Sequence, residues 1–355
     1  MKTSELLSRT LDQIGALDEG AMAKAQERQD RLTKPQGSLG RLETVSVQLA
    51  GIQGRSIPGI QEKAVIVMAG DHGILEEKFH NWPQEVTAQM VLNFFQGGAA
   101  INVLARHAGA RVVVVDMGVA SPLAADPRLV SRKVGRGTRN MAVGPAMSVD
   151  QAIAAVEAGI EVVSGEIERG LDLVATGDMG IGNTSPSAAI CSVITGRSVP
   201  EVTGRGTGID DEQLSRKINA IQRAIALNRP DPRDPIDTLS KVGGFEIAGL
   251  VGVILAAAAH RIAVVIDGFI SGAAALIATE MCPQVRGYLF AGHLSAEPGH
   301  RIMLDHMGLL PILSLDMRLG EGTGAALAMG LIEASARVLG EMATFEEASV
   351  SEKQG

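Results

Sequence analysis

The segment at residues 317–325 joins one carboxylate to an arginine and several glycines. It reads Met-Arg-Leu-Gly-Glu-Gly-Thr-Gly-Ala and separates an apolar run from an alanine-rich helical pattern. Two of its glycines and the final alanine formally fit the G-x-G-x-x-G/A turn of dinucleotide-binding folds. Only about 30 residues follow, with no further strand to complete a βαβ unit, and Glu321 would face a pyrophosphate. We therefore interpret Glu321 as a proton acceptor for a bound base, and Arg318 as a cation that holds a phosphate oxygen.

A second glycine-rich stretch, residues 177–187, reads Gly-Asp-Met-Gly-Ile-Gly-Asn-Thr-Ser-Pro-Ser. A strand leads into this turn and a helix follows it, with Asn183 and Thr184 as capping residues. Free N–H groups at the start of a helix favour anions, and Gly180 and Gly182 would let a ligand approach the backbone closely. An ordinary tight turn with a helix cap would give the same pattern.

Residues 204–208, Gly-Arg-Gly-Thr-Gly, form a third such stretch and precede a helix that carries Lys217. This loop could wrap a phosphate, with the lysine ammonium as a point charge one to two turns into the helix. Taken alone, the pattern favours a flexible loop and a solvated lysine.

Asp71 and His72, which follow an apolar run, suggest a metal ligand pair. No second ligand lies at a useful spacing, and His300 and His306 are six residues apart, which is poor for one helix face. The sequence therefore predicts no metal site. It also contains no P-loop, no G-x-S-x-G and no H-E-x-x-H motif.

Short continuous apolar runs alternate with segments of helical periodicity. The runs predict strands covered on both faces, and they lie at residues 63–70, 111–117, 172–176, 262–267, 288–291 and 312–317. The helical segments are about residues 85–107, 150–169, 211–226, 245–259, 272–280 and 323–339. This alternation predicts an α/β, Rossmann-like fold, with a mainly parallel sheet of about six strands flanked by helices. Ligands of such sheets bind beyond the carboxyl ends of the strands, so we expect Asp178, Asp267 and Glu321 along one edge.

Residues 1–60 are polar and helical in pattern, with a Pro- and Gly-containing loop at residues 34–38. We expect them to form a smaller helical domain, joined by the C-terminal tail at residues 340–355. Residues 61–339 would then form the large catalytic domain. The tail from about Thr344 is polar and acidic, and we expect it to fray or to pack on the surface.

Composition excludes several classes of protein. The net charge is −8 and no run of Lys and Arg exceeds two residues, which argues against nucleic acid as a partner. The longest apolar stretch, residues 247–259, is shorter than the ~20 residues that span a bilayer, so we expect no membrane association. Two cysteines without a C-x-x-C pair, and an N-terminus without the apolar run of a signal peptide, predict a cytoplasmic protein.

Taken in order, these stretches resemble the nicotinate-nucleotide–dimethylbenzimidazole phosphoribosyltransferase family of cobalamin lower-loop assembly. Each is weak alone, but the ordered set is specific. The resembling segments are residues 34–43, 68–73, 83–90, 177–186, 240–245, 267–271, 295–297 and 317–329. The resemblance implies transfer of the phosphoribosyl group of nicotinate mononucleotide to dimethylbenzimidazole, giving α-ribazole phosphate and nicotinate. It also implies a homodimer and a reaction that needs no metal or organic cofactor.

The resemblance also assigns roles to residues. Glu321 resembles the catalytic base. Contacts to phosphate, ribose or base are implied for the remaining matched positions: Gly180, Gly182, Asn183, Thr184, Lys217, Asp267, Arg318, Leu319, Pro83 and Met90. Asp178 stands where the family usually has glutamate, so its shorter side chain leaves a second catalytic carboxylate open. The stretch Phe-His-Asn-Trp at residues 79–82 is unlike the family, and the indole of Trp82 could stack on the acceptor base or serve as a lid.

Several hypotheses remain beside this one. A nucleotide-dependent dehydrogenase would explain the glycine turn, but the βαβ context around Gly320 is missing. An inactive homologue that needs an active partner would be expected to have lost Glu321, Arg318 or Lys217, and all three are present. A phosphoribosyltransferase for a different azole or phenol base remains open.

Overall fold

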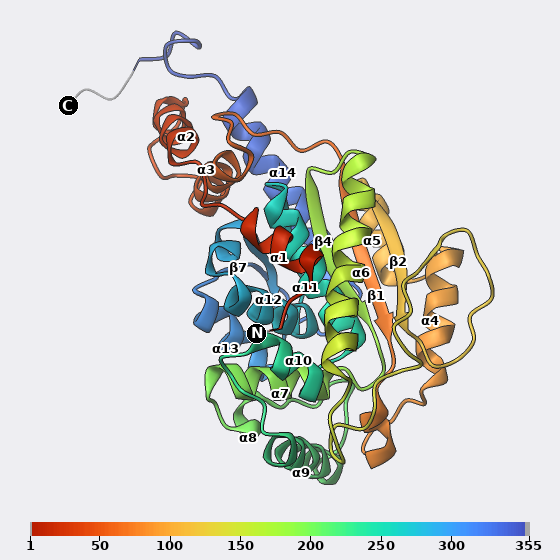
Figure 1. The fold of residues 1–355 in the computed structure, drawn as a ribbon. Helices are drawn as coiled ribbons and strands as arrows, with labels where there is room; N and C mark the ends of the chain where they lie inside the picture. The colour runs from red at the N-terminus through yellow and green to blue at the C-terminus, as the bar shows by residue number, and fades with distance from the viewer. Residues whose placement is uncertain (1, 352–355) are drawn as a thin grey trace.

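The computed structural model describes residues 2–351, and within them a seven-stranded parallel sheet forms the centre of the molecule (Figure 1). The strand order is β3-β2-β1-β4-β5-β6-β7. The strands are β1 Lys63–Gly70, β2 Ala110–Gly118, β3 Leu129–Ser131, β4 Leu173–Met179, β5 Ala263–Ile266, β6 Leu289–Leu294 and β7 Pro311–Ser314. This confirms the predicted α/β class and the position of each predicted strand. The added strand, β3, has only three residues, too few to give an apolar run.

The chain reverses its direction across the sheet between β1 and β4. β2 pairs with one side of β1, and β3 pairs with β2 at the edge of the sheet. The chain then crosses back, and β4 pairs with the other side of β1. The crossover leaves a crevice outside the carboxyl ends of these two strands, where open α/β sheets bind ligands. All eight residues of β1 are buried, as expected for a strand that is covered on both faces.

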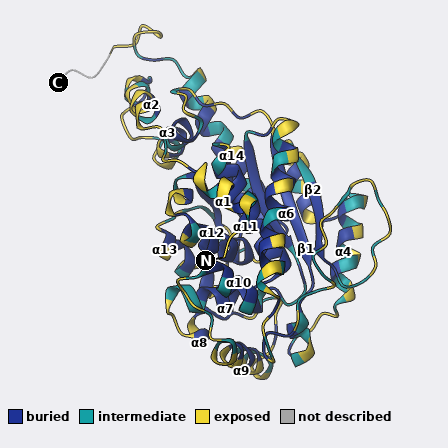
Figure 2. Cartoon of the chain, in the orientation of Figure 1, coloured by how far each residue is buried: buried dark blue, intermediate teal, exposed yellow. Residues whose placement is uncertain are grey.

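Helices cover both faces of the sheet. They are α1 Glu5–Asp12, α2 Glu19–Arg31, α3 Arg41–Gln53, α4 Glu85–Gln96, α5 Ala100–Ala108, α6 Val149–Glu168, α7 Thr184–Thr195, α8 Val199–Val202, α9 Asp211–Asn228, α10 Pro235–Val242, α11 Phe245–Ala259, α12 Phe269–Met281, α13 Pro298–Met307 and α14 Thr323–Glu341, with 3₁₀ helices η1 Gly73–Glu77 and η2 Pro283–Tyr288. α11 packs on the central strands and against α6, whereas α5 and α14 pack together on β2, β4, β5 and β6. Figure 2 shows the strands buried, with exposed residues on the outward sides of α2, α3, α6 and α9.

The helical segment predicted at residues 85–107 is two helices. α4 ends at Gln96, and Gly97 follows in the left-handed region with a φ of 75° before α5 begins. A glycine adopts this conformation without steric cost, so the chain turns here and the predicted single helix was wrong. The break matters because it creates a second helix N-terminus, that of α5, beside the site described below.

A smaller helical layer lies at one end of the molecule. α2, α3 and the last turns of α14 pack around a separate apolar cluster of Ala25, Ala50 and Leu339. Leu32 and Thr344 form an isolated antiparallel bridge, so the chain after α14 pairs with the chain after α2 (Figure 1). α1 instead contacts α6 and α11 on the sheet body. The domain limits at residues 60 and 339 stay a prediction, and the predicted tail extends to residues 352–355, outside the described part.

No helix among residues 2–351 combines the length and the apolar character that crossing a bilayer requires.

Candidate active site

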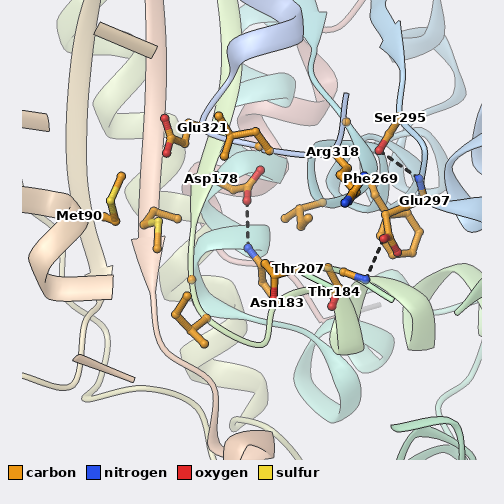
Figure 3. A pocket seen from close by; sticks show the side chains of 18 of the residues that line it. Met90, Asp178, Asn183, Thr184, Thr207, Phe269, Ser295, Glu297, Arg318 and Glu321 are labelled. Carbon is orange, nitrogen blue, oxygen red and sulfur yellow. Dashed lines mark hydrogen bonds between the residues drawn. The ribbon is translucent and has the colours of Figure 1, made fainter. Parts of the chain in front are cut away.

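A cavity of about 410 Å³ opens beyond the carboxyl ends of β4, β5 and β6, next to the crevice outside β1 and β4 (Figure 3). The structure brings most of the predicted site residues together around it. Nine of them line this cavity: Trp82, Met90, Asp178, Gly180, Asn183, Thr184, Arg318, Leu319 and Glu321. Gly182 and Lys217 line a smaller adjoining cavity of about 60 Å³ that shares much of the same wall. Pro83 and Asp267 line neither cavity.

Glu321 occupies a strained turn. Its φ is +63°, and the flanking Gly320 and Gly322 also have positive values of 86° and 89°. A left-handed conformation at a residue other than glycine costs about 1–3 kcal/mol and persists only where the surroundings enforce it. The surroundings of Glu321 enforce this conformation, because its N–H donates to the carbonyl oxygen of Asp178 at 3.2 Å. A Cβ at Gly177 would lie 2.5 Å from the Glu321 carbonyl oxygen, so β4 and this turn are in direct backbone contact.

The Glu321 carboxylate lies at the N-terminus of α5. Its Oε2 accepts a hydrogen bond from the backbone N–H of Ile101 at 3.4 Å, in the first turn of that helix. Burial raises the pKa of Glu321; the Ile101 N–H opposes this, and the negative charge of Asp267 adds to it. The group is therefore a carboxylate that accepts a proton more readily than an exposed glutamate does, as suits a general base.

Asp178 is the second carboxyl of the cavity, and it is buried at the end of β4. Its Oδ2 accepts a hydrogen bond from Asn183 Nδ2 at 2.9 Å, visible in Figure 3. Burial raises the pKa of Asp178 well above its usual range, and the nearby charges of Asp267, Glu246 and Glu321 raise it further. Asp178 therefore holds a proton more tightly than an exposed aspartate does.

Asp267 supports the Glu321 turn from beneath. It is completely buried, and its two carboxylate oxygens accept hydrogen bonds from the N–H groups of Gly322 at 3.2 Å and Ala325 at 2.9 Å. His293 Nε2 lies 3.6 Å from Asp267 Oδ1. Asp267 thus caps the start of α14 from another strand, β5, instead of facing the cavity, where a substrate contact was expected.

The glycine turn before α7 is packed tightly against β1. A Cβ at Gly180 would lie 2.3 Å from the carbonyl oxygen of Gly70, and Gly182 has a φ of +94°, so both positions require glycine. The Ile181 N–H donates to Thr87 Oγ1 of α4 at 3.1 Å. Asn183, expected as a capping residue, instead turns its side chain to Asp178. The first turn of α7 therefore has no side-chain cap. Its Thr184 N–H has no acceptor within residues 2–351, whereas the Ser185 N–H donates to the Gly182 carbonyl oxygen at 3.0 Å and Pro186 has no N–H.

Lys217 of α9 reaches the same turn. Its Nζ donates to Thr184 Oγ1 at 2.8 Å and to the Gly204 carbonyl oxygen at 3.0 Å. The side chain is buried, so the expected alternative of a solvated lysine is wrong. Burial lowers the pKa of Lys217 to about 8, and the charge of Glu297 opposes that shift. Two glycine loops and one buried ammonium thus converge at this end of the cavity.

Arg318 and Leu319 lie on the loop between β7 and α14. The carbonyl oxygen of Met317 accepts the N–H of Ala296 at 3.0 Å, which ties this loop to the chain after β6. Within residues 2–351, no hydrogen bond or ion pair engages the Arg318 guanidinium, and its side chain lines the cavity. Arg318 is therefore available for an anionic ligand.

Four residues that line the cavity were not predicted as site residues from the sequence. Phe269 and Ile270 begin α12 after β5, and Ser295 and Glu297 follow β6. Glu297 Oε1 accepts the Gly206 N–H at 2.9 Å and so holds the second glycine loop. Two signals for these residues were present: they follow two predicted strands, and they lie within the resembling segments 267–271 and 295–297. Neither signal gives the direction of each side chain.

Trp82 lines both cavities, although 51% of its surface is exposed. Pro83 is exposed and starts the approach to α4. The indole therefore lies at the mouth of the cavity, where it can contact a flat ligand without being enclosed.

Comparison with known proteins matches residues 14–350 to the phosphoribosyltransferase family. The chain is 66% identical over 350 residues to nicotinate-nucleotide–dimethylbenzimidazole phosphoribosyltransferase of Dehalococcoides mccartyi, with 99% of each chain covered. The chain belongs to this family. It is also 57% identical over 347 residues to the Geobacter sulfurreducens enzyme of the same name, covering 98% of this chain and 99% of that one.

Solved structures agree with this assignment. The crystal structure of the enzyme of that name from Thermus thermophilus matches with a TM-score of 0.91 and 47% sequence identity, covering 95% of this chain and all of the other. The family resemblance inferred from the ordered segments is thus confirmed, together with the fold.

Proposed function

We propose that this protein transfers the phosphoribosyl group of nicotinate mononucleotide to 5,6-dimethylbenzimidazole or a related lower-ligand base. The products are α-ribazole 5′-phosphate and nicotinate, for the nucleotide loop of cobalamin. Relatives that carry this enzyme name over almost their full length support the proposal. The single observation that carries it is a buried glutamate with a raised pKa, Glu321, in a cavity whose opposite end collects glycine loops and a buried lysine.

The cavity suits a nucleotide and a flat base together. Met90, Val86 and Leu319 provide apolar walls near Glu321, where an aromatic base would be covered. The phosphate of the nucleotide would lie at the start of α7, near Lys217 and within reach of Arg318. Ribose would then bridge the two ends, with C1′ directed towards the base.

The chemistry needs one proton acceptor. Nicotinate attached to ribose is a pyridinium, so the bond from C1′ to its ring nitrogen breaks with both electrons returning to that nitrogen. One ring nitrogen of the incoming base forms the new bond to C1′. The other ring nitrogen loses its proton to the Glu321 carboxylate, which leaves a neutral azole on ribose. Nicotinate leaves as a neutral ring nitrogen and needs no general acid. Contacts to the phosphate, remote from C1′, supply the rest of the catalysis by holding the ribose in position for attack.

The proposal includes a cytoplasmic homodimer that requires no metal or organic cofactor. The two cysteines, Cys191 and Cys282, are buried and unpaired, which fits a reducing compartment. Sedimentation of the purified protein would test the dimer.

The test is product identification. Purified protein is incubated with nicotinate mononucleotide and, separately, with each member of a panel of benzimidazoles, purines and phenols, and products are identified by mass. We expect α-ribazole phosphate and stoichiometric nicotinate with dimethylbenzimidazole. Protein that binds both substrates but forms no ribosylated base would refute the proposal, and a preference for a phenol would revise the acceptor.

A further inference from the structure

The smaller cavity contains a histidine whose ring nitrogen has no partner. His80 lines this space of about 60 Å³ together with the glycine turn before α7 and Lys217. Its Nε2 is buried and makes no hydrogen bond within residues 2–351. A buried polar atom without a partner costs free energy, and such atoms in native proteins commonly await a ligand or a water molecule.

The residues on either side of His80 in the chain are both fixed by contacts. Phe79, which is completely buried, lies against the His80 ring with ring centroids 4.3 Å apart. The next residue, Asn81, donates from Nδ2 to the Gly208 carbonyl oxygen at 3.3 Å and accepts from Gln213 Nε2 at 2.7 Å. The segment at residues 79–82 is thereby tied to the second glycine loop and to α9, so the imidazole belongs to the wall of this cavity.

The Nε2 atom lies at the turn where an anion would bind. A Cβ at Gly182 would be 3.5 Å from His80 Nε2, so the ring is in van der Waals contact with the α7 turn. Lys217 faces the same cavity, and Arg205 lines it as well, with its guanidinium paired to Asp211. The backbone N–H groups of Gly182 and Thr184, which have no acceptor within residues 2–351, share this small space with an ammonium and an imidazole, a combination that suits a phosphate.

We propose that His80 is a phosphate ligand, which donates its Nε2–H to an oxygen of the substrate's 5′-phosphate. This inference rests on the proposed function and adds a specificity residue to it. Burial, Lys217 and His72 lower the pKa of His80 to about 3, so the imidazole is neutral near pH 7 and has one N–H to donate. A neutral donor completes the site without adding a further full charge beside Lys217 and the paired Arg205.

Two variants of similar volume separate the donor from the packing. His80→Gln can place an amide N–H near the position of Nε2, whereas His80→Leu cannot donate. His107→Leu, at an exposed position near the end of α5, is the matched control. KM and kcat are measured with nicotinate mononucleotide and with nicotinate riboside, which lacks the phosphate, and inorganic phosphate is tested as a competitive inhibitor.

We expect His80→Leu to raise KM for the nucleotide roughly tenfold or more, since a hydrogen bond to a charged group is lost. KM for the riboside and kcat should change less than about twofold, and inhibition by inorganic phosphate should weaken in parallel. His80→Gln should recover most of the nucleotide affinity, and His107→Leu should match wild type.

Two results would overturn the inference. One is an equal effect of His80→Leu on nucleotide and riboside, which would mean that the imidazole only supports the wall. The other is unchanged phosphate inhibition in both His80 variants, which would mean that a buried water molecule satisfies Nε2. Failure of the proposed function is distinguishable, because wild type would then form no ribosylated base, while titration calorimetry with inorganic phosphate would still test the site.

Discussion

At the scale of single residues, the site depends on carboxyl groups whose pKa values are raised by burial. Glu321 and Asp178 both shift in this direction, Asp178 more strongly. A carboxyl with a raised pKa is a better proton acceptor, but only while it is ionised, so its activity is lost as pH falls through that pKa. Lys217 sets the upper pH limit of activity, because its ammonium loses its proton and its charge as pH rises through about 8.

Loss of the cationic residues should weaken nucleotide binding. We expect Lys217→Met and Arg318→Ala each to raise KM for nicotinate mononucleotide about 10- to 100-fold, equivalent to about 1.5–3 kcal/mol for a charge-assisted contact. In wild type, KM for the nucleotide should also rise above pH 8 as Lys217 loses its proton. Initial-rate kinetics across pH provide the measurement, with Arg216→Ala as a control on the exposed side of α9. Wild-type KM in both variants would place the phosphate elsewhere.

Trp82 should affect the base and not the nucleotide. An indole at the mouth of the cavity can stack on a bicyclic base, which adds about 0.5–1.5 kcal/mol beyond burial. We therefore expect Trp82→Ala to raise KM for dimethylbenzimidazole several-fold and to change the ranking of alternative bases, with little change for the nucleotide. Because this is the only tryptophan in the chain, its fluorescence should respond to titration with the base. No response, together with an unchanged ranking, would make Trp82 a lid or interface residue.

Sequence reasoning identified residues whose neighbours in the chain reveal their role. Glu321 and Arg318 follow an apolar run within a glycine turn, and the pattern alone argued against a dinucleotide turn. The role of Asp267 as a support for the Glu321 turn was not predicted, because only the folded chain shows that its oxygen meets the N–H group of a residue 55 positions away. His80 and Glu297 depend on contacts between loops, which a local pattern does not contain.

At the scale of elements, the turn that presents Glu321 depends on Asp267. In Asp267→Asn, an amide NH₂ replaces one of the two oxygens that accept hydrogen bonds. This NH₂ would face the backbone N–H of Gly322 or of Ala325, so one hydrogen bond would be lost. We expect kcat to fall about tenfold or more, with KM nearly unchanged, and the acid limb of the pH profile to move to lower pH because Asp267 raises the pKa of Glu321.

A matched control exists at the opposite end of the sheet. Asp172 also accepts two backbone N–H groups through its carboxylate, from Gln61 and Glu62, before β4. Because both N–H groups donate to Oδ2, asparagine could keep them, so the control is Asp172→Ala, which should lower the melting temperature without changing kcat or the pH profile. If Asp267→Asn affects only the melting temperature as well, its role is structural support and not positioning of the base.

The contact between α6 and α11 tests the packing of the elements. A Cβ at Gly252 would lie 1.9 Å from the Val156 carbonyl oxygen, so the two helix backbones touch. We expect Gly252→Ala to destabilise the fold by at least about 1–3 kcal/mol, since no side chain can move aside. Gly165→Ala on exposed α6 surface, with no atom within 4 Å of its Cβ, should be neutral or stabilising. Urea unfolding of both variants measures the difference, and equal free energies of unfolding would contradict the close crossing.

Element prediction succeeded where the chain is long and periodic. α11 was predicted with its observed limits, because its apolar residues are continuous from the first turn to the last. The single helix expected at residues 85–107 failed because two successive glycines permit a turn that helical periodicity does not exclude. β3 was missed because an edge strand of three residues gains its pairing from β2 and not from its own composition.

At the scale of the whole molecule, the strand order determines where the site lies. Reversal between β1 and β4 opens the crevice, and Glu321 enters it from the chain after β7. α14 then runs from the site at Thr323 to the small helical layer at Leu339, so one helix links the two regions (Figure 1). The alternation of strands and helices predicted this class of fold, but the side on which each strand joins the sheet came only from the structure.

The most direct test of the account is the rate of the chemical step with and without the Glu321 carboxylate. Single-turnover experiments with excess enzyme, nicotinate mononucleotide and dimethylbenzimidazole would compare wild type, Glu321→Gln and the control Glu19→Gln, which changes an exposed residue of α2. The account predicts that Glu321→Gln folds and binds the nucleotide like wild type but forms α-ribazole phosphate about 10²–10⁴-fold more slowly. A rate within about threefold of wild type at neutral pH would contradict Glu321 as the base.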